Sequence, residues 1–168
     1  MSQDFQDKVV LITGSSRGLG KAMAHGFAAR GANLAIVSRK LEGCDATATE
    51  LSEAYGIDTF TRSTHVGDWD DLDRMVEAVI ERFGRIDVLV NNAGMSPLYP
   101  SLSEVSEALF DKVVSVNLKG PFRLMANVGE RMMNGDGGAI INISSTASVN
   151  KSPASEPYGA AKAGLNNL

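Results

Sequence analysis

Short apolar runs alternate with longer amphipathic segments along the whole chain. Residues 8–13, 33–38, 85–90 and 138–144 are almost continuously apolar, whereas a strand with one solvated face would alternate apolar and polar positions. Strands of this kind are typical of a parallel sheet whose two faces are both covered by helices. A weaker, more polar run at residues 57–61 suits an edge strand.

Segments with helical spacing fill the gaps between these runs. The clearest has apolar residues at positions 72, 75, 76, 79, 80 and 83, which form one buried stripe. Asp68 is placed to cap its first turn and Gly84 to end it. Further helices are expected at residues 18–30, 41–55 and 106–133, and another begins before Leu168. This order predicts an α/β fold with a doubly wound, Rossmann-like parallel sheet, formed by residues 1–168 as one domain.

The apolar strand at residues 138–144 would form an open edge of this sheet unless another strand followed it. Open apolar edges promote aggregation. We therefore expect a sheet that is incomplete at its C-terminal edge. The 168-residue chain is expected to be a fragment, or to need a partner that covers this edge.

The charge balance and the single cysteine narrow the class of protein. Sixteen basic and 20 acidic residues give a net charge of −4, whereas a nucleic-acid-binding domain usually carries a basic face. Cys44 cannot form an internal disulfide, which favours a reducing compartment. The sequence shows no signal peptide and no apolar run near the roughly 20 residues that cross a bilayer. We expect a soluble cytoplasmic protein with no nucleic-acid or membrane partner.

A glycine-rich turn joins the first strand to the first helix, with the spacing G-x-x-x-G-x-G over Gly14, Gly18 and Gly20. Glycines permit a tight turn and the close approach of a diphosphate to the backbone. The free N–H groups at the start of the following helix then favour an anion. The turn predicts a dinucleotide-binding site, although a plain glycine-rich connector would have the same composition.

Two other motifs overlap this turn. Gly14 to Gly18 also fits G-x-S-x-G, the nucleophile elbow of hydrolases, but no histidine follows His65 to complete a triad. Gly20, Lys21 and Ala22 resemble the end of a P-loop, but that motif needs Ser or Thr in place of Ala22. Neither alternative is favoured.

The end of the second strand bears on the choice of dinucleotide. An acidic residue there would bind a ribose 2′-hydroxyl and favour NAD, but the sequence has Ser38, Arg39 and Lys40. Arg39, together with Arg17 in the turn, could pair with a 2′-phosphate. The sequence therefore favours NADP(H) over NAD(H), unless these cations are ordinary solvated surface charges.

Tyr158 and Lys162 are four residues apart and so share one helix face. A phenol is a weak acid at neutral pH, and a nearby ammonium stabilises its phenolate, which suits it to proton transfer. The motif is weak alone, but it follows the glycine-rich turn, Asn91-Asn92-Ala93-Gly94 after one strand and Ser144-Ser145 after the next. With this ordered set, the chain from about Lys8 to Leu168 resembles the short-chain dehydrogenase/reductase family.

The resemblance implies a carbonyl reductase or alcohol dehydrogenase that uses hydride transfer. It implies Tyr158 as general acid/base, Lys162 as the residue that supports it and holds the nicotinamide ribose, and Ser145, rather than Ser144, as the group that orients the substrate carbonyl. Asn117 matches the family's Asn that holds a water in a proton relay. A physical reason for this role is Pro121, four residues later, which has no N–H to donate to the Asn117 carbonyl. That carbonyl would be free to accept from a water, and the helix should kink there. The implied cofactor-binding residues are Gly14, Ser16, Arg17, Gly18, Leu19, Gly20, Ser38, Arg39, His65, Val66, Asn92, Ala93, Gly94, Tyr158 and Lys162, and no metal ligand is expected.

The chain departs from the family in two ways. His65-Val66 stands where members commonly have Asp-Val, which puts the adenine contact in doubt. The family's C-terminal strands and much of its substrate pocket are missing, so we expect poor turnover from these 168 residues. A non-catalytic nucleotide-binding fragment and an epimerase or dehydratase with tightly held NAD remain alternatives. His25 is interpreted as an ordinary helix-surface residue, and the small residues near Tyr158 suggest a homodimer or homotetramer.

Overall fold

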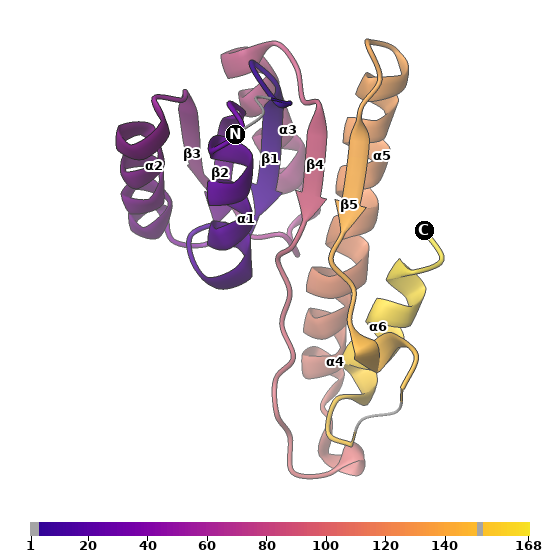
Figure 1. The fold of residues 1–168 in the computed structure, drawn as a ribbon. Coiled ribbons are helices and arrows are strands. Elements are labelled where there is room, and N and C mark those ends of the chain that lie inside the picture. Colours follow the sequence, from indigo (N-terminus) through magenta and orange to yellow (C-terminus); the bar gives the residue numbers. More distant parts are fainter. Residues whose placement is uncertain (1–3, 151–152) are drawn as a thin grey trace.

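The computed structural model describes residues 4–150 and 153–168. Five parallel strands form one sheet in the order β3-β2-β1-β4-β5 (Figure 1). The chain starts near the middle of the sheet, winds to one edge and then crosses to the other. The strands are β1 (Val9–Thr13), β2 (Asn33–Ser38), β3 (Thr59–Ser63), β4 (Val88–Asn91) and β5 (Ala139–Asn142).

Helices cover both faces of the sheet, as a doubly wound fold requires. One core packs α1 and α2 against the sheet, and a second packs α3 and α5 against the opposite face. None of the helices in the described ranges combines the length and apolar character needed to cross a bilayer. The helices are α1 (Gly18–Ala28), α2 (Leu41–Tyr55), α3 (Trp69–Phe83), α4 (Glu107–Val114), α5 (Gly120–Met133) and α6 (Glu156–Leu165), with short helical segments η1 (Leu102–Glu104), η2 (Ser115–Lys119) and η3 (Thr146–Ser148).

The predicted ends of the helices are largely confirmed. The Asp68 side chain accepts a hydrogen bond from the amide of Asp71 and so caps α3. Gly84 and Gly56 end α3 and α2 in the left-handed conformation. Helix α1 ends at Ala28, two residues earlier than predicted, and Gly31 follows with a φ of +88°.

The two edge strands differ from expectation in different ways. The polar strand predicted at residues 57–61 is an edge strand, but β3 starts two residues later because Thr59 pairs with Leu34. β5 was expected to be covered on both faces, and this is wrong for the chain described. Ala139 is exposed and Ile141 is 40% exposed. Both lie on the same face of the edge strand β5, and no strand or helix of the described residues covers that face.

The long helical region predicted at residues 106–133 is interrupted. Helix α4 passes into η2, a five-residue π-helix, before α5 begins at Gly120. Pro121 lies in the first turn of α5, directly after η2, so its missing N–H falls where the helical hydrogen-bond pattern changes. The disturbance expected at Pro121 therefore takes the form of a π-helical segment, a feature that often occurs at functional sites.

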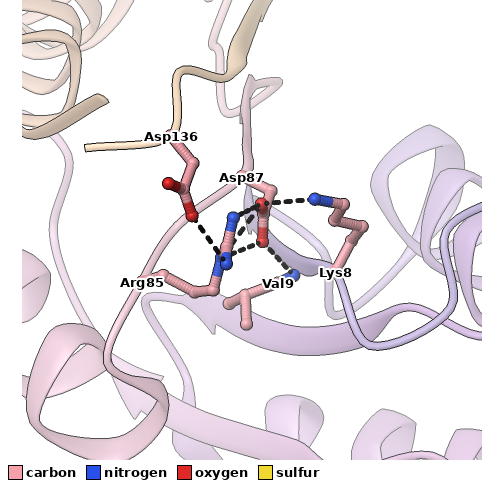
Figure 2. Close-up of polar contacts among 5 residues, drawn as sticks. All are labelled: Lys8, Val9, Arg85, Asp87 and Asp136. Carbon is pink, nitrogen blue, oxygen red and sulfur yellow. Dashed lines mark hydrogen bonds and ion pairs between the residues drawn. The ribbon is translucent and has the colours of Figure 1, made fainter. Parts of the chain in front are cut away.

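An ionic cluster ties the amino ends of two central strands together (Figure 2). The Asp87 side chain, only 7% exposed, accepts hydrogen bonds from the Val9 amide, Lys8 and Arg85. Burial alone would raise the pKa of Asp87, but these three donors more than offset it and hold the pKa below its usual value. Arg85 also pairs with Asp136 on the outer side. This cluster lies at the end of the sheet away from the residues predicted to form the site.

Candidate active site

The carboxyl ends of β1 and β4 flank the point where the strand order reverses. The chain reaches β4 after winding out to β3, so β1 pairs with β2 on one side and with β4 on the other. In open α/β sheets, ligands bind at such a switch point, outside the carboxyl ends of the strands. The glycine-rich turn follows β1 here, and the segment of residues 92–94 follows β4.

The turn after β1 needs its glycines. Gly14 and Gly18 adopt positive φ angles of 70° and 56°. A Cβ at Gly20 would overlap the carbonyl oxygen of Gly14, so the helix can approach the turn only without a side chain there. Ser15 fixes the turn from inside, since its Oγ donates to the Ile12 carbonyl and accepts from the Val37 amide.

The start of α1 is open to an anion. Arg17 occupies its N-cap position without a capping hydrogen bond from its side chain, and Arg17, Gly18 and Leu19 are exposed. A Cβ added to Gly18 would meet nothing within 4 Å. Uncapped amides at a helix start favour phosphate oxygens. The turn therefore fits the diphosphate of a dinucleotide.

The segment after β4 is locked to this turn. The Asn92 amide nitrogen Nδ2 donates to the carbonyl oxygens of Thr13 and Gly14, at 2.8 and 3.2 Å. Thr13 Oγ1 accepts from the backbone amides of Asn92 and Ala93, both at 3.1 Å. These contacts join the carboxyl ends of β1 and β4. Sequence reasoning did not single out Thr13, whose Oγ1 also donates to the Val90 carbonyl at 3.4 Å.

Asn117 is completely buried in η2 and holds the loop that follows β4. Its Nδ2 donates to the carbonyls of Met95 and Val113, and its Oδ1 accepts from the Met95 amide. A Cβ at Gly94 would lie 2.9 Å from this Oδ1 and 3.8 Å from Lys162 Nζ. The structure thus brings Gly94, Asn117 and Lys162 together from three segments.

Lys162 lies on α6 and is only 2% exposed. Its Nζ donates to the Ile143 carbonyl at 2.6 Å and lies 5.8 Å from the centre of the Tyr158 ring. Burial lowers the pKa of Lys162, because the charged ammonium is desolvated. One turn of α6 therefore places a buried amine next to a half-buried phenol, as the four-residue spacing predicted.

The two serines after β5 have different environments. Ser144 Oγ donates to Asn166 Oδ1 at 2.5 Å, near the end of α6. Ser145 starts η3, where its Oγ accepts from the Ala147 amide. This short helix packs closely on α6, since a Cβ at Gly159 would lie 2.8 Å from the Ala147 carbonyl oxygen. Ser145 therefore lies on the turn that packs against the helix carrying Tyr158.

The remaining predicted residues lie at the ends of β2 and β3 and in the turn after β1. Arg39 is exposed, and Ser38 Oγ contacts the Lys40 carbonyl at 3.5 Å. His65 is exposed just after β3, and its Nδ1 accepts from the Gly67 amide, whereas Val66 is buried. Ser16 is half-buried beside α2, because a Cβ at Gly43 would lie 3.2 Å from the Ser16 Cβ.

One contact between the loop after β4 and α6 was not predicted. The Tyr99 hydroxyl donates to the Glu156 carboxylate and accepts from the Glu156 amide at 2.9 Å. The hydrogen bond from Tyr99 lowers the pKa of Glu156. These residues are 57 positions apart, so no local pattern could have paired them. The pair ties the loop after β4 to the first turn of α6 (Figure 1).

The family model for short chain dehydrogenases matches residues 8–168, and the chain belongs to this family. It is 42% identical over 165 residues to an uncharacterized oxidoreductase of Thermotoga maritima, a match that covers 98% of this chain and 64% of that protein. The chain therefore spans less than two thirds of the length of this relative.

Two solved structures match with a TM-score of 0.93 over 98% of this chain. One is a metagenomic short-chain oxidoreductase in complex with NADP, at 34% identity and covered to 74%. The other is an NAD⁺-bound xylitol dehydrogenase, at 27% identity and covered to 63%. The predicted Rossmann-like fold is thereby confirmed, while the two neighbours differ in the cofactor that their structures contain.

Proposed function

We propose that the protein is an NADP(H)-dependent oxidoreductase that interconverts a carbonyl and an alcohol, with residues 1–168 as its dinucleotide-binding domain. The supporting observation is the convergence of Gly94, Asn117 and Lys162 next to Tyr158, on the segment that Asn92 joins to the turn before α1. Gly94 follows β4, Asn117 lies in η2, and Lys162 and Tyr158 lie on α6, so these groups come from three separate segments. Their meeting at the switch point of the sheet is what a hydride-transfer site needs.

A bound nicotinamide dinucleotide supplies or accepts the hydride. In the direction of reduction, Tyr158 Oη donates a proton to the substrate oxygen, and in the direction of oxidation it accepts that proton. Lys162 stabilises the phenolate that remains and binds the nicotinamide ribose. Ser145 donates to the substrate oxygen and orients it. Asn117 fixes the backbone around Met95. Together with the η2 backbone it holds the water that relays the proton.

Replacing Tyr158 tests the activity. In the full-length protein, Tyr158→Phe should lower the rate of NADPH-dependent reduction across a panel of ketones and aldehydes about 100- to 10,000-fold, because the general acid is lost. The affinity for NADPH should change little. The control is Tyr55→Phe, which alters an exposed tyrosine on α2 and should keep full activity. Equal turnover by wild type and Tyr158→Phe would contradict the proposal.

Two exposed cations support the choice of NADP(H). Arg17 precedes α1 and Arg39 follows β2, and no carboxylate follows β2 before α2 begins at Leu41. Since a charged hydrogen bond contributes about 1.5–3 kcal/mol, Arg39→Ala should weaken NADPH binding about 10- to 100-fold. The affinity for NADH, which lacks the 2′-phosphate, should stay within about twofold. Titration calorimetry measures both, and tighter binding of NADH than of NADPH by the wild type would contradict this preference.

We also propose that copies of the protein associate through α4 and α6. A cavity of about 590 Å³ lies between them and is lined mainly by Leu102, Val105, Phe110, Pro157 and Ala160. Leu102 and Phe110 are exposed, and burial of such surface favours association. Two of the small residues in α6 serve the chain itself, since Gly159 packs on η3 and Gly164 packs on Leu118. Sedimentation equilibrium of the full-length protein tests the proposal, which a strictly monomeric protein would contradict.

A further inference from the structure

Three side chains form a hydrogen-bonded row between α1 and α2. Glu50 Oε1 lies 2.9 Å from His25 Nε2, and His25 Nδ1 lies 3.2 Å from the Tyr55 hydroxyl oxygen. The His25 and Tyr55 rings meet edge to face, with centroids 5.8 Å apart. Tyr55 is the last residue of α2 and is 40% exposed. His25, which the sequence placed on a helix surface, thus links two helices through its side chain.

The partners of His25 assign the positions of the protons. The Glu50 carboxylate can only accept hydrogen bonds. A hydrogen bond from Lys21, with a smaller contribution from His25, also holds the pKa of Glu50 below its usual value. Nε2 then carries the hydrogen that faces Glu50, and in the neutral form of the imidazole Nδ1 carries none. Nδ1 presents its lone pair to Tyr55, and the phenol is the donor in that contact.

We propose that Tyr55 is a nucleophilic tyrosine that accepts activated acyl groups, with His25 as its general base and Glu50 orienting the imidazole. A carboxylate, an imidazole and a hydroxyl in this order are the groups that activate a nucleophile in acyl transfer. The phenol oxygen attacks the acyl carbon, and the new O–C bond replaces the bond to the leaving group. The phenol proton passes to His25 Nδ1 and from there to the leaving group.

The other two tyrosines of the chain lack this arrangement. Tyr99 donates its hydroxyl proton to the Glu156 carboxylate. Tyr158 is half-buried against Lys162 on α6. Tyr99 therefore serves as the slow reference within the same molecule, and Tyr158 serves to report that the fold is intact. The proposed acceptor site shares no residue with the oxidoreductase site, so it does not depend on the function proposed above.

Acylation by N-acetylimidazole tests the proposal, with the acetyl groups located by mass spectrometry of peptides. Tyr55 should react faster than Tyr99 and free N-acetyltyrosinamide. His25→Phe keeps a ring beside Tyr55 but removes the base, and should slow acetylation of Tyr55 at least about tenfold. Glu50→Gln should also slow it, because the imidazole loses its orienting carboxylate. In each variant, unchanged rates at Tyr99 and Tyr158 show that the fold is intact.

Lys21→Gln is the matched control. Lys21 pairs with the other oxygen of Glu50 but touches neither His25 nor Tyr55 among the contacts described. Because exposed ion pairs contribute little, acetylation of Tyr55 in this variant should stay within about threefold of the wild type. The proposal is overturned if Tyr55 reacts no faster than free N-acetyltyrosinamide, or if His25→Phe leaves its rate unchanged.

Discussion

Gly20 illustrates how a single residue sets the geometry of the turn. A Cβ there would overlap the Gly14 carbonyl oxygen and come 2.6 Å from Asn92 Nδ2, so the turn or the start of α1 would have to move. We expect Gly20→Ala to lower the free energy of unfolding by about 1–3 kcal/mol, the usual cost of overpacking. The same shift should weaken dinucleotide binding. Chemical denaturation and calorimetric titration measure the two effects.

Gly26 offers a control in the same helix. A Cβ at Gly26 would meet nothing within 4 Å. Gly26→Ala should therefore leave cofactor binding unchanged and raise the free energy of unfolding by about 0.5–1 kcal/mol, since Ala loses less backbone entropy than Gly in a helix. Similar destabilisation by both substitutions would show that the close approach at Gly20 is not the cause.

At the scale of elements, the Tyr99 contact joins the loop after β4 to α6. Tyr99→Phe removes both hydrogen bonds to Glu156 and keeps the ring. Since a lost hydrogen bond costs about 1 kcal/mol, amide hydrogen exchange at residue 156 and in the loop should become about fivefold faster. Leu98→Ala, at a neighbouring position that is 87% exposed, is the control and should leave exchange unchanged. Unchanged exchange in Tyr99→Phe would show that the contact does not hold the loop.

Elements with strong local signals were predicted well. The apolar stripe of α3, the Asp68 cap and the glycine that ends the helix were all visible in the sequence and agree with the structure. The π-helix η2 was not, because periodicity alone does not distinguish it from an α-helix. The exposure of β5 was also missed, since a composition typical of a buried strand does not tell whether a neighbour lies beside it.

For the candidate site, too, the local motifs were predicted from the sequence and the long-range contacts were not. The order of motifs indicated which strand ends would meet, because parallel strands share one carboxyl edge. The actual contacts, such as Asn117 with Met95 and Tyr99 with Glu156, join segments 22 and 57 residues apart. Such pairs depend on how the loops pack, and the sequence has no periodic signal for them.

For the whole molecule, the Asp87 cluster joins β1 to β4 at the end of the sheet opposite the site (Figure 2). Asp87→Asn should lower the free energy of unfolding by about 2 kcal/mol at neutral pH, because a buried charge-assisted network is broken. The pKa of Asp87 is lower in the folded than in the unfolded state. Its stabilising effect is therefore complete above the unfolded value of 3.8 and is lost as the pH falls through the folded pKa.

Denaturation by urea over a series of pH values measures this effect. The difference between wild type and Asp87→Asn should shrink as the solution becomes acidic. Asp136→Asn is the control, because this carboxylate is 80% exposed and its ion pair among the described residues is with Arg85, away from Asp87. It should change the free energy of unfolding by less than about 0.5 kcal/mol. A difference for Asp87→Asn that stays constant down to strongly acidic pH would contradict the assignment.

The most direct test of the account is a crystal structure of the full-length protein with NADP(H). We expect the diphosphate on the backbone amides of residues 17–19, the 2′-phosphate beside Arg39, and the nicotinamide ribose in contact with Tyr158 and Lys162. A cofactor bound away from the carboxyl ends of β1 and β4, or one whose nicotinamide lies out of reach of Tyr158, would contradict it.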